Sequence, residues 1–201
     1  GTRHFAEEVT PTVVHDLPAV GQGMQDHPKI SYRFWIDTDA PVWPNPWIQV
    51  LLTAYAEIDG EPRLFQFMPY AGTTEAGHRF SDWNVQVADA RGRTGTIELA
   101  GRDPRLQPRI AMGWLEAEGD RDVAVAGGQE LMALARTEPI ARVVHSWPNQ
   151  DDPDQPLRTV ETFHHVVGTC RMGRPGDPDA VVGADARVFG IDGLSVIDAS
   201  I

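Results

Sequence analysis

The segment FHHVVGTCRMG at residues 163–173 decides how this chain of 201 residues is interpreted. It holds two adjacent histidines, His164 and His165, a Gly-Thr turn, and Cys170, the only cysteine of the chain. The segment GIDGLSVIDASI at residues 190–201 lies downstream and predicts a closing apolar strand. No other part of the sequence holds as many side chains that can act as a base, a nucleophile or a ligand. This segment is therefore the first candidate for a functional site.

Composition argues against several classes of partner. The net charge is −12 and no run of lysine or arginine occurs, which disfavours nucleic acid and an anionic membrane surface. No apolar run approaches the roughly 20 residues that span a bilayer, and the first residues lack the apolar core of a signal peptide. One cysteine forms no internal disulfide, so the cytoplasm is the expected compartment. Because the chain starts at Gly1 and stops on Ile201, both ends are expected to be cut ends of a longer protein.

Alternating side chains predict an antiparallel sheet. Residues 29–37 and 47–58 alternate, and a third strand is expected over 64–70. The dipeptide Asp59-Gly60 predicts a tight turn between the second and third strands. In the first strand the predicted apolar face consists of Ile30, Tyr32, Phe34 and Ile36.

Residues 120–135 are the best helix candidate, with Asp120 or Asp122 as the expected N-cap. Gly127-Gly128 is expected to weaken the middle of this helix. Loops are expected over 39–46 and 149–156, where prolines and aspartates gather. Antiparallel strands flanked by one or two helices make an α+β fold, and no run of βαβ units occurs.

Three motifs together resemble the glucose–methanol–choline (GMC) family of flavin oxidoreductases. The C-terminal motif is HVVGTCRMG at residues 165–173 with the segments that follow it through Ile201. The second is LPAVGQGMQDHP at residues 17–28, and a weaker third combines TIEL at 96–99 with the proline-bounded residues 103–110. All three stand in the family's order, and the resemblance covers nearly the whole chain.

The resemblance implies three regions. Residues 1–28 would be a remnant of the FAD-binding domain, 29–160 the substrate-binding domain with its antiparallel sheet and flanking helices, and 161–201 the catalytic segment and the return to the FAD-binding domain. The sequence lacks the family's N-terminal Gly-x-Gly-x-x-Gly motif, which grips the ADP half of FAD, and its second catalytic His or Asn. The chain is therefore expected to be a C-terminal portion whose partner is the missing N-terminal half. By itself it is expected neither to retain FAD nor to turn over.

The resemblance also implies the roles of individual residues. Family members oxidise small-molecule alcohols by passing a hydride to FAD, and their catalytic histidine corresponds to His165. Imidazole suits a general base because its unperturbed pKa lies nearest neutral pH. At Gly23 many members carry Asn, so one side-chain contact to the cofactor is expected to be absent. The residues implied to contact FAD are Asp26, His27, Asp198, Ala199 and Ser200.

Other interpretations stay open at this point. A non-catalytic binding or regulatory module on the same scaffold is the main alternative, but it gives no reason to keep His165 beside an intact Gly168-Thr169 turn. A metal site of His164, His165 and Cys170 is disfavoured because adjacent strand residues point to opposite faces, so no metal is expected. Cys170 as a nucleophile and a cofactor-free hydrolase are disfavoured too, the latter because no Gly-x-Ser-x-Gly elbow occurs.

The sequence indicates neither the substrate nor the electron acceptor. His27 is equally well explained as a structural turn residue before Pro28. Five tryptophans fit either an apolar substrate pocket or the core of the sheet. They are Trp35, Trp43, Trp47, Trp83 and Trp114.

Overall fold

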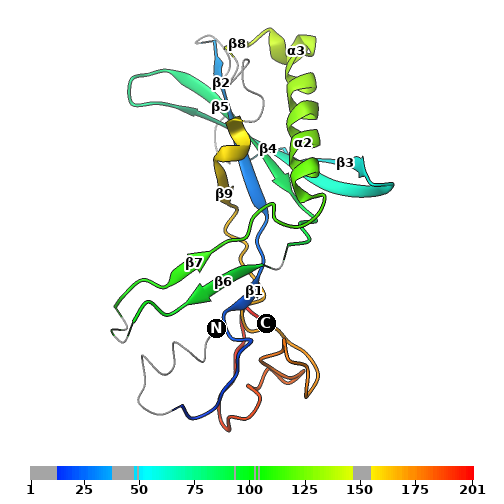
Figure 1. Ribbon diagram of the computed structural model, residues 1–201. Helices are drawn as coiled ribbons and strands as arrows, with labels where there is room; N and C mark the ends of the chain where they lie inside the picture. The colour runs from blue at the N-terminus through cyan, green and yellow to red at the C-terminus, as the bar shows by residue number, and fades with distance from the viewer. Residues whose placement is uncertain are drawn as a thin grey trace. The chain divides into compact units, whose positions relative to one another are not determined.

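The computed structural model describes residues 13–37, 48, 50–92, 94–101, 103, 105–146 and 155–201 (Figure 1). The chain divides into two compact units. Unit 1 comprises Gly1–Asp26, Gly92–Glu116 and His164–Ile201, and unit 2 comprises His27–Arg91 and Ala117–Phe163. Both units are therefore assembled from separate stretches of sequence. The predicted loop 39–46 and most of the predicted loop 149–156 lie outside the described residues.

Unit 2 is built on a six-stranded antiparallel sheet, as the alternation predicted. The strand order is β3-β4-β5-β2-β8, and β9 also pairs with β2. The strands are β2 (Pro28–Ile36), β3 (Leu52–Ile58), β4 (Glu61–Thr73), β5 (Arg79–Val87), β8 (Val144–Ser146) and β9 (Val160–Thr162). The α+β fold class is confirmed.

The hairpin between β3 and β4 closes at the predicted dipeptide. Ile58 pairs with Glu61, which leaves a loop of Asp59 and Gly60. Both residues have positive φ, 53° and 77°. Two successive positive φ values define a type I′ turn, whose twist matches that of the flanking strands.

One face of this sheet forms the core of unit 2. The helix α2 (Asp120–Ala135), whose bounds agree with the prediction, contacts β3, β4 and β5. A Cβ on Gly127 would lie 2.6 Å from Cγ1 of Val85, and one on Gly128 would overlap the hydroxyl of Tyr32. The glycine pair, expected to weaken the helix, thus lets its backbone approach the sheet. Buried on this face are Ile30, Tyr32, Phe34, Phe65, Phe67, Val85 and Val87.

The N-terminus of α2 differs from the prediction. Its N-cap is Gly119, and no side chain makes the capping hydrogen bond, so the expected role of Asp120 or Asp122 as N-cap is wrong. Asp120 is instead 1% exposed and accepts a 2.5 Å hydrogen bond from Nη2 of Arg63, a side chain that is itself buried. Nε of Arg63 also donates to Asp89 at 3.0 Å. A buried carboxylate needs a charged or hydrogen-bonding partner. Asp120 finds this partner in Arg63 and not in the N–H groups at the start of the helix. The short helix α3 (Glu138–Ala141) follows α2, and the 3₁₀ turn η1 (Gln155–Arg158) precedes β9.

Two of the tryptophans, Trp83 and Trp35, lie on opposite sides of the sheet of unit 2. Trp83 lies on the helix-covered side of the sheet, edge-on to Phe34 at 6.4 Å between ring centroids. Trp35 lies on the opposite side, edge-on to Phe80. Trp43 and Trp47 are outside the part of the chain that the structure describes.

Unit 1 contains a smaller antiparallel sheet and long irregular segments. Strands β1 (Gln22–Met24), β6 (Gly95–Glu98) and β7 (Arg109–Ala111) pair in the order β1-β6-β7. The predicted closing strand within 190–201 is wrong, because turns at Gly190 and Gly193, with φ of 73° and 76°, break it. The apolar residues of this region instead form a cluster, in which Ala19, Val181, Val182 and Val188 are buried and Leu17, Cys170, Ile191, Val196 and Ile201 pack against them.

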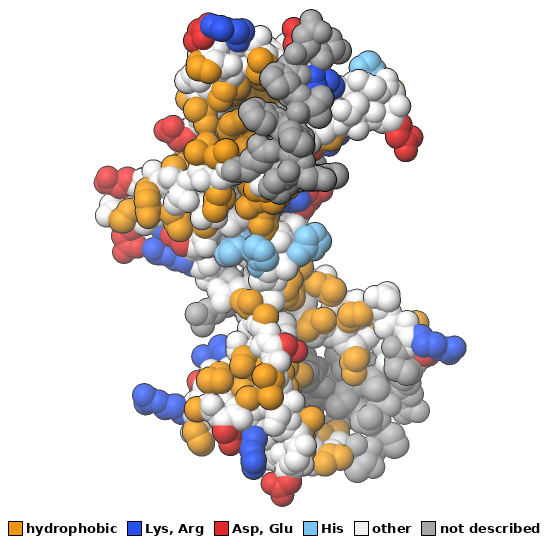
Figure 2. All heavy atoms as spheres, turned by 180° about the vertical axis from the view of Figure 1, so that it is seen from behind, with side chains coloured by type: hydrophobic (Ala, Val, Ile, Leu, Met, Phe, Trp, Pro, Cys, Tyr) orange, Lys and Arg blue, Asp and Glu red, His pale blue; other side chains and the backbone are white. Residues whose placement is uncertain are grey.

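The contacts between residues place 92–116 in unit 1. The resemblance to the family placed them in the substrate-binding domain, 29–160, and this division into functional domains stays a prediction. Among the described residues, no helix has the length and apolar character needed to cross a membrane. Figure 2 shows lysine and arginine side chains scattered over the face it presents, with no basic patch among the residues described there.

Candidate functional site

The backbone of His165 is fixed by a distant carboxylate within unit 1. Its N–H donates to Oδ1 of Asp26 at 3.1 Å, and Asp26 is 7% exposed. An isolated antiparallel β-bridge reinforces this contact, because Gln25 and Val167 exchange two backbone hydrogen bonds of 3.0 and 2.9 Å. The preceding residue, His164, adopts a left-handed φ of 63°. The His165 side chain is exposed on unit 1.

The other edge of the same segment pairs with the end of the chain. The N–H of Gly168 donates to the carbonyl of Ala199 at 3.4 Å, and that of Cys170 donates to the carbonyl of Ser200 at 2.6 Å. Residues 165–170 therefore lie between residues 25–26 and residues 199–200. Three stretches that are far apart in the sequence form one local site in unit 1.

Glycines make this close approach possible. Gly168 has a φ of 88°, and a Cβ there would lie 3.0 Å from the carbonyl oxygen of Gly23. Gly21 has a φ of 77°, donates to the carbonyl of Thr169 at 2.8 Å, and would overlap the carbonyl of Ile97 if it carried a Cβ. Only glycine meets both requirements without strain.

The carboxylate of Asp198 fixes the position of Ser200 through two hydrogen bonds. Its Oδ1 accepts hydrogen bonds from Oγ of Ser200 at 2.5 Å and from the backbone N–H of Ser200 at 2.8 Å. These bonds, the side-chain one first, lower the pKa of the Asp198 carboxyl below its usual range. Asp198 and Ala199 are exposed and Ser200 is half-buried, so an ionised carboxylate and accessible backbone lie beside the His165 segment.

The structure thus brings together five of the six predicted site residues: Asp26, His165, Asp198, Ala199 and Ser200 all belong to unit 1. His27 does not join them, because it belongs to unit 2. There it is half-buried, and its Nδ1 lies 3.4 Å from Nε2 of Gln86. The expected turn at His27 is not formed, and its cofactor role stays a prediction.

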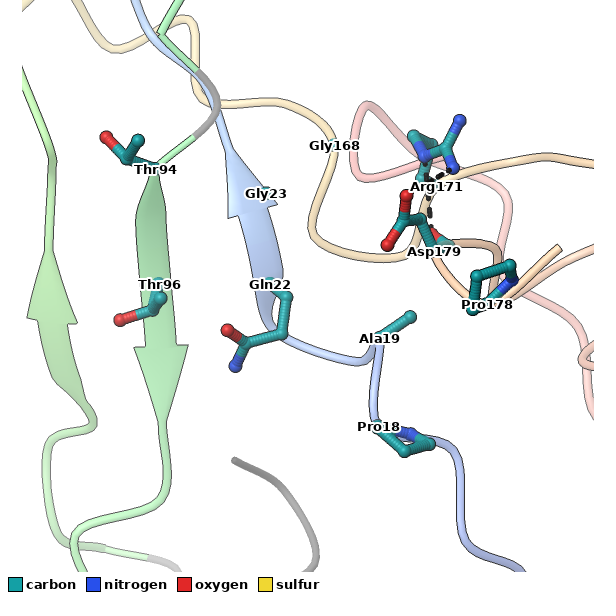
Figure 3. Close-up of a pocket in the computed structure, with 10 residues that line it drawn as sticks. All are labelled: Pro18, Ala19, Gln22, Gly23, Thr94, Thr96, Gly168, Arg171, Pro178 and Asp179. Carbon is teal, nitrogen blue, oxygen red and sulfur yellow. Dashed lines mark hydrogen bonds and ion pairs between the residues drawn. The ribbon is translucent and has the colours of Figure 1, made fainter. Parts of the chain in front are cut away.

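A cavity of about 460 Å³, lined by both polar and apolar residues, opens in unit 1 (Figure 3). Figure 3 shows Gln22 on β1, Thr96 on β6 with Thr94 just before that strand, and Arg171 beside Asp179. The guanidinium of Arg171 pairs with Asp177 at 3.1 Å and Asp179 at 3.7 Å. The volume lies within the range of about 300–1,000 Å³ typical of small-molecule sites. The lining residues are Pro18, Ala19, Gln22, Gly23, Thr94, Thr96, Gly168, Arg171, Pro178 and Asp179.

Gln22 is a site residue that the sequence did not reveal. Its Nε2 is buried and has no hydrogen-bond partner among the described residues. A buried donor without a partner costs about 1–3 kcal/mol, so this amide is suited to a ligand that brings an acceptor oxygen. In the sequence, only the position of Gln22 between Gly21 and Gly23 could have indicated that it lies at a ligand site.

Among the described residues, no group of three or more His, Cys, Asp or Glu side chains could hold a metal ion. Cys170 is a half-buried free thiol that packs against the apolar cluster of unit 1.

Comparisons with known proteins agree on one family. A model described as GMC oxidoreductase matches residues 90–201. The chain is 28% identical over 248 residues to a glucose dehydrogenase [FAD, quinone] of Drosophila melanogaster, with 100% of this chain and 39% of that protein covered. It is 30% identical over 221 residues to a choline oxidase of Arthrobacter globiformis, with 98% of this chain and 39% of that protein covered.

A solved structure shares the fold. Pyridoxine 4-oxidase from Mesorbium loti aligns with a TM-score of 0.80 and 23% identity, over 100% of this chain and 42% of that one. The chain thus spans about two fifths of the length of the relatives it matches, at 39% for both curated proteins.

Proposed function

The chain belongs to the GMC oxidoreductase family, and on that premise we propose that it is the substrate-binding and catalytic portion of an FAD-dependent oxidoreductase that oxidises an alcohol. The observation that carries the proposal is the local site of unit 1, where the N–H of His165 donates to the buried carboxylate of Asp26. The names of two relatives, a glucose dehydrogenase and a choline oxidase, support an alcohol as the substrate class.

His165 acts as the general base in this proposal. Its imidazole accepts the hydroxyl proton of the substrate while a hydride leaves the carbinol carbon, so the alcohol becomes a carbonyl compound. Bound FAD supplies the acceptor of that hydride. A positioned base of this kind contributes a factor of about 10²–10⁴ to the rate. Asp26 positions the base through the backbone and does not touch the reacting atoms.

A buried amide of unit 1 supplies a hydrogen-bond donor that suits an oxygen of FAD. Nε2 of Gln22, buried and without a partner among the described residues, can donate to a phosphate or carbonyl oxygen. The other proposed cofactor contacts of unit 1 are Asp26, Asp198, Ala199 and Ser200. His27 stays a separate prediction. Gly23 contributes open space, because a Cβ there would meet nothing within 4 Å.

The test uses the full-length gene product that contains this chain. Its flavin absorption is followed without oxygen while a panel of alcohols is added, and we expect one of them to bleach the flavin band. His165→Ala should slow flavin reduction by about 100-fold or more, as loss of a general base does. His164→Asn is the matched control, because Asn tolerates the left-handed φ of 63° at that position.

Equal rates for wild type and His165→Ala would exclude His165 as the base, as would equal losses in His165→Ala and His164→Asn. A protein that shows no flavin band even after FAD is added would support the alternative of a non-catalytic binding module.

A further inference from the structure

One margin of the sheet of unit 2 is formed by β3, which pairs with β4 and with no other described strand (Figure 1). The opposite margin consists of two short strands, β8 and β9, of three residues each. An edge strand presents a row of unpaired N–H and C=O groups to which another strand can bond. With seven residues, β3 is the longer edge and the better template for such pairing.

The hairpin turn fixes which backbone groups of β3 face outward. The pair that flanks the two-residue turn, Ile58 with Glu61, is a hydrogen-bonded pair. Hydrogen-bonded and non-hydrogen-bonded pairs alternate along an antiparallel ladder. The N–H and C=O groups that point away from β4 are therefore those of Thr53, Tyr55 and Glu57. No backbone hydrogen bond among the described residues reaches these groups from outside the β3–β4 ladder.

The sequence of β3 contains none of the usual obstacles to edge pairing. Natural edge strands are blunted by lysine, by proline or by a bulge. β3 reads LTAYAEI, without lysine or proline, and its register with β4 is unbroken. Its central residue, Tyr55, is 68% exposed, and Glu57 is its one charged side chain. The edge is therefore suited to receive a strand of similar sequence.

The outward residues of β3 are complementary to themselves. When two copies of β3 run antiparallel about a two-fold axis at Tyr55, each Tyr55 lies opposite the other, and Thr53 of each copy lies opposite Glu57 of the other. All outward N–H and C=O groups then face one another in hydrogen-bonded pairs. An axis one residue earlier or later would instead place Glu57 or Thr53 opposite a residue outside β3. The axis at Tyr55 is therefore the register that uses the whole edge.

The side chains on the open face of the sheet agree with this register. Oγ1 of Thr53 accepts a hydrogen bond from Nε2 of Gln66 at 3.3 Å, so its hydroxyl proton can be donated to the carboxylate of Glu57 in the other copy. No two like charges lie opposite each other, which would be destabilising. The two Tyr55 rings lie side by side at the axis, and aromatic pairs across strands are stabilising.

The side chains on the face covered by α2 agree with it as well. Leu52, which is 37% exposed, lies opposite the half-buried Ile58 of the other copy. Ala54 lies opposite Ala56, so the rows on this face are apolar. Burial of apolar surface along these rows favours association. The apolar face of one sheet would thus continue into that of the other.

We propose that two copies of this protein associate through β3, antiparallel about a two-fold axis at Tyr55, so that the two sheets of unit 2 become one. The surface is the same on both copies, as in the isologous interfaces of most homodimers. β3 contributes no residue to the site of unit 1, so the inference is independent of the flavin chemistry. Pairing of one strand makes a small interface, and we expect a reversible dimer.

The experiment measures the oligomeric state of the full-length, FAD-loaded protein. Sedimentation velocity over about 1–100 μM should show a dimer whose share rises with concentration. Tyr55→Lys and Tyr55→Glu each place like charges opposite each other at the axis, and each should weaken the dimer by about tenfold or more. An equimolar mixture of the two variants should form a mixed dimer, because Lys then lies opposite Glu.

A gain of affinity provides a second readout. Thr53→Lys places a cation opposite Glu57 in both symmetry-related pairs and should strengthen the dimer by about threefold, whereas Thr53→Glu should weaken it by about as much. A lysine on an edge strand opposes pairing with most strands, so strengthening is specific to this register. Thr73→Lys, at the exposed end of β4, is the matched control and should leave dimerisation unchanged.

Three results would overturn the inference. A protein that stays monomeric over this concentration range would mean that another part of the full-length protein, or a different partner, covers β3. A dimer that both Tyr55 variants and Thr53→Glu leave intact would use another surface. A mixture of Tyr55→Lys and Tyr55→Glu that dimerises no better than either variant alone would exclude the two-fold axis at Tyr55.

Discussion

The carboxylate of Asp26 accepts a hydrogen bond from the backbone N–H of His165, 3.1 Å away and 139 residues further along the chain. A buried carboxylate thereby fixes the backbone next to the side chain to which we assign the proton transfer. The contact links two of the three motifs by which the sequence resembles its family, the segments 17–28 and 165–173. These motifs therefore meet in space through defined hydrogen bonds.

Replacing Asp26 by Ala should destabilise unit 1 and misplace His165. Loss of a hydrogen bond to a buried charged acceptor costs about 1–3 kcal/mol, and urea unfolding of the full-length protein measures it. The rate of flavin reduction should fall by about tenfold, with little change in the pH at which it is half-maximal, because His165 itself remains. Arg187→Gln removes an exposed ion pair with Asp185 and should cost less than about 0.5 kcal/mol. A shifted pH profile in Asp26→Ala would show instead that Asp26 takes part in the proton transfer.

Gly168→Ala should be more harmful than a glycine substitution at an equally strained but open position. Gly176 has a φ of 87° and open space for a Cβ, whereas Gly168, with a φ of 88°, has the carbonyl of Gly23 at 3.0 Å. Gly176→Ala should cost about 1–2 kcal/mol for the left-handed backbone alone. Gly168→Ala should cost more and should also slow flavin reduction, because it pushes the segment of His165 away from β1. Equal losses of stability in the two variants would mean that the close approach contributes nothing.

Burial of Tyr32 should make unit 2 sensitive to alkaline pH. Desolvation raises the pKa of Tyr32 to about 12. In the unfolded chain a tyrosine ionises near pH 10, so the stabilising contribution is complete below pH 10 and is lost as the pH rises toward 12. Tyr32→Phe should lose less stability than wild type between pH 9 and pH 11, by an amount on the order of 1 kcal/mol. Tyr55→Phe, at an exposed tyrosine, is the control and should follow wild type. Identical pH dependence in Tyr32→Phe and wild type would contradict the assignment.

Local patterns predicted most of unit 2. The alternation that includes Ile30, Tyr32 and Phe34 identified the buried face of β2. The dipeptide Asp59-Gly60 identified the hairpin turn between β3 and β4. Both signals depend only on neighbouring residues. The N-cap of α2 could not be predicted in this way. Asp120 pairs with Arg63, which lies 57 residues away in the sequence, and no local pattern carries that information.

Unit 1 was predictable mainly through its motifs. The resemblance selected Asp26, His165 and Asp198 although no regular secondary structure connects them, and the structure brings them into one unit. It did not select Gln22, because a buried amide without a partner is recognised only once its surroundings are known. The closing strand was wrong because apolar residues near Gly190 and Gly193 pack into a cluster and not into a ladder.

The interleaved order of the two units has a consequence for synthesis on the ribosome. Unit 2 is complete in sequence once Phe163 has left the exit tunnel, whereas unit 1 still lacks its third stretch, which begins at His164. Ala19 in particular must wait for Val181, Val182 and Val188, the buried residues of its cluster. Since compact units tend to fold as soon as they are complete, the sheet of unit 2 folds before the earlier stretch of unit 1 that ends at Asp26. The segment that carries His165 therefore reaches its native contacts after the sheet of unit 2 has formed.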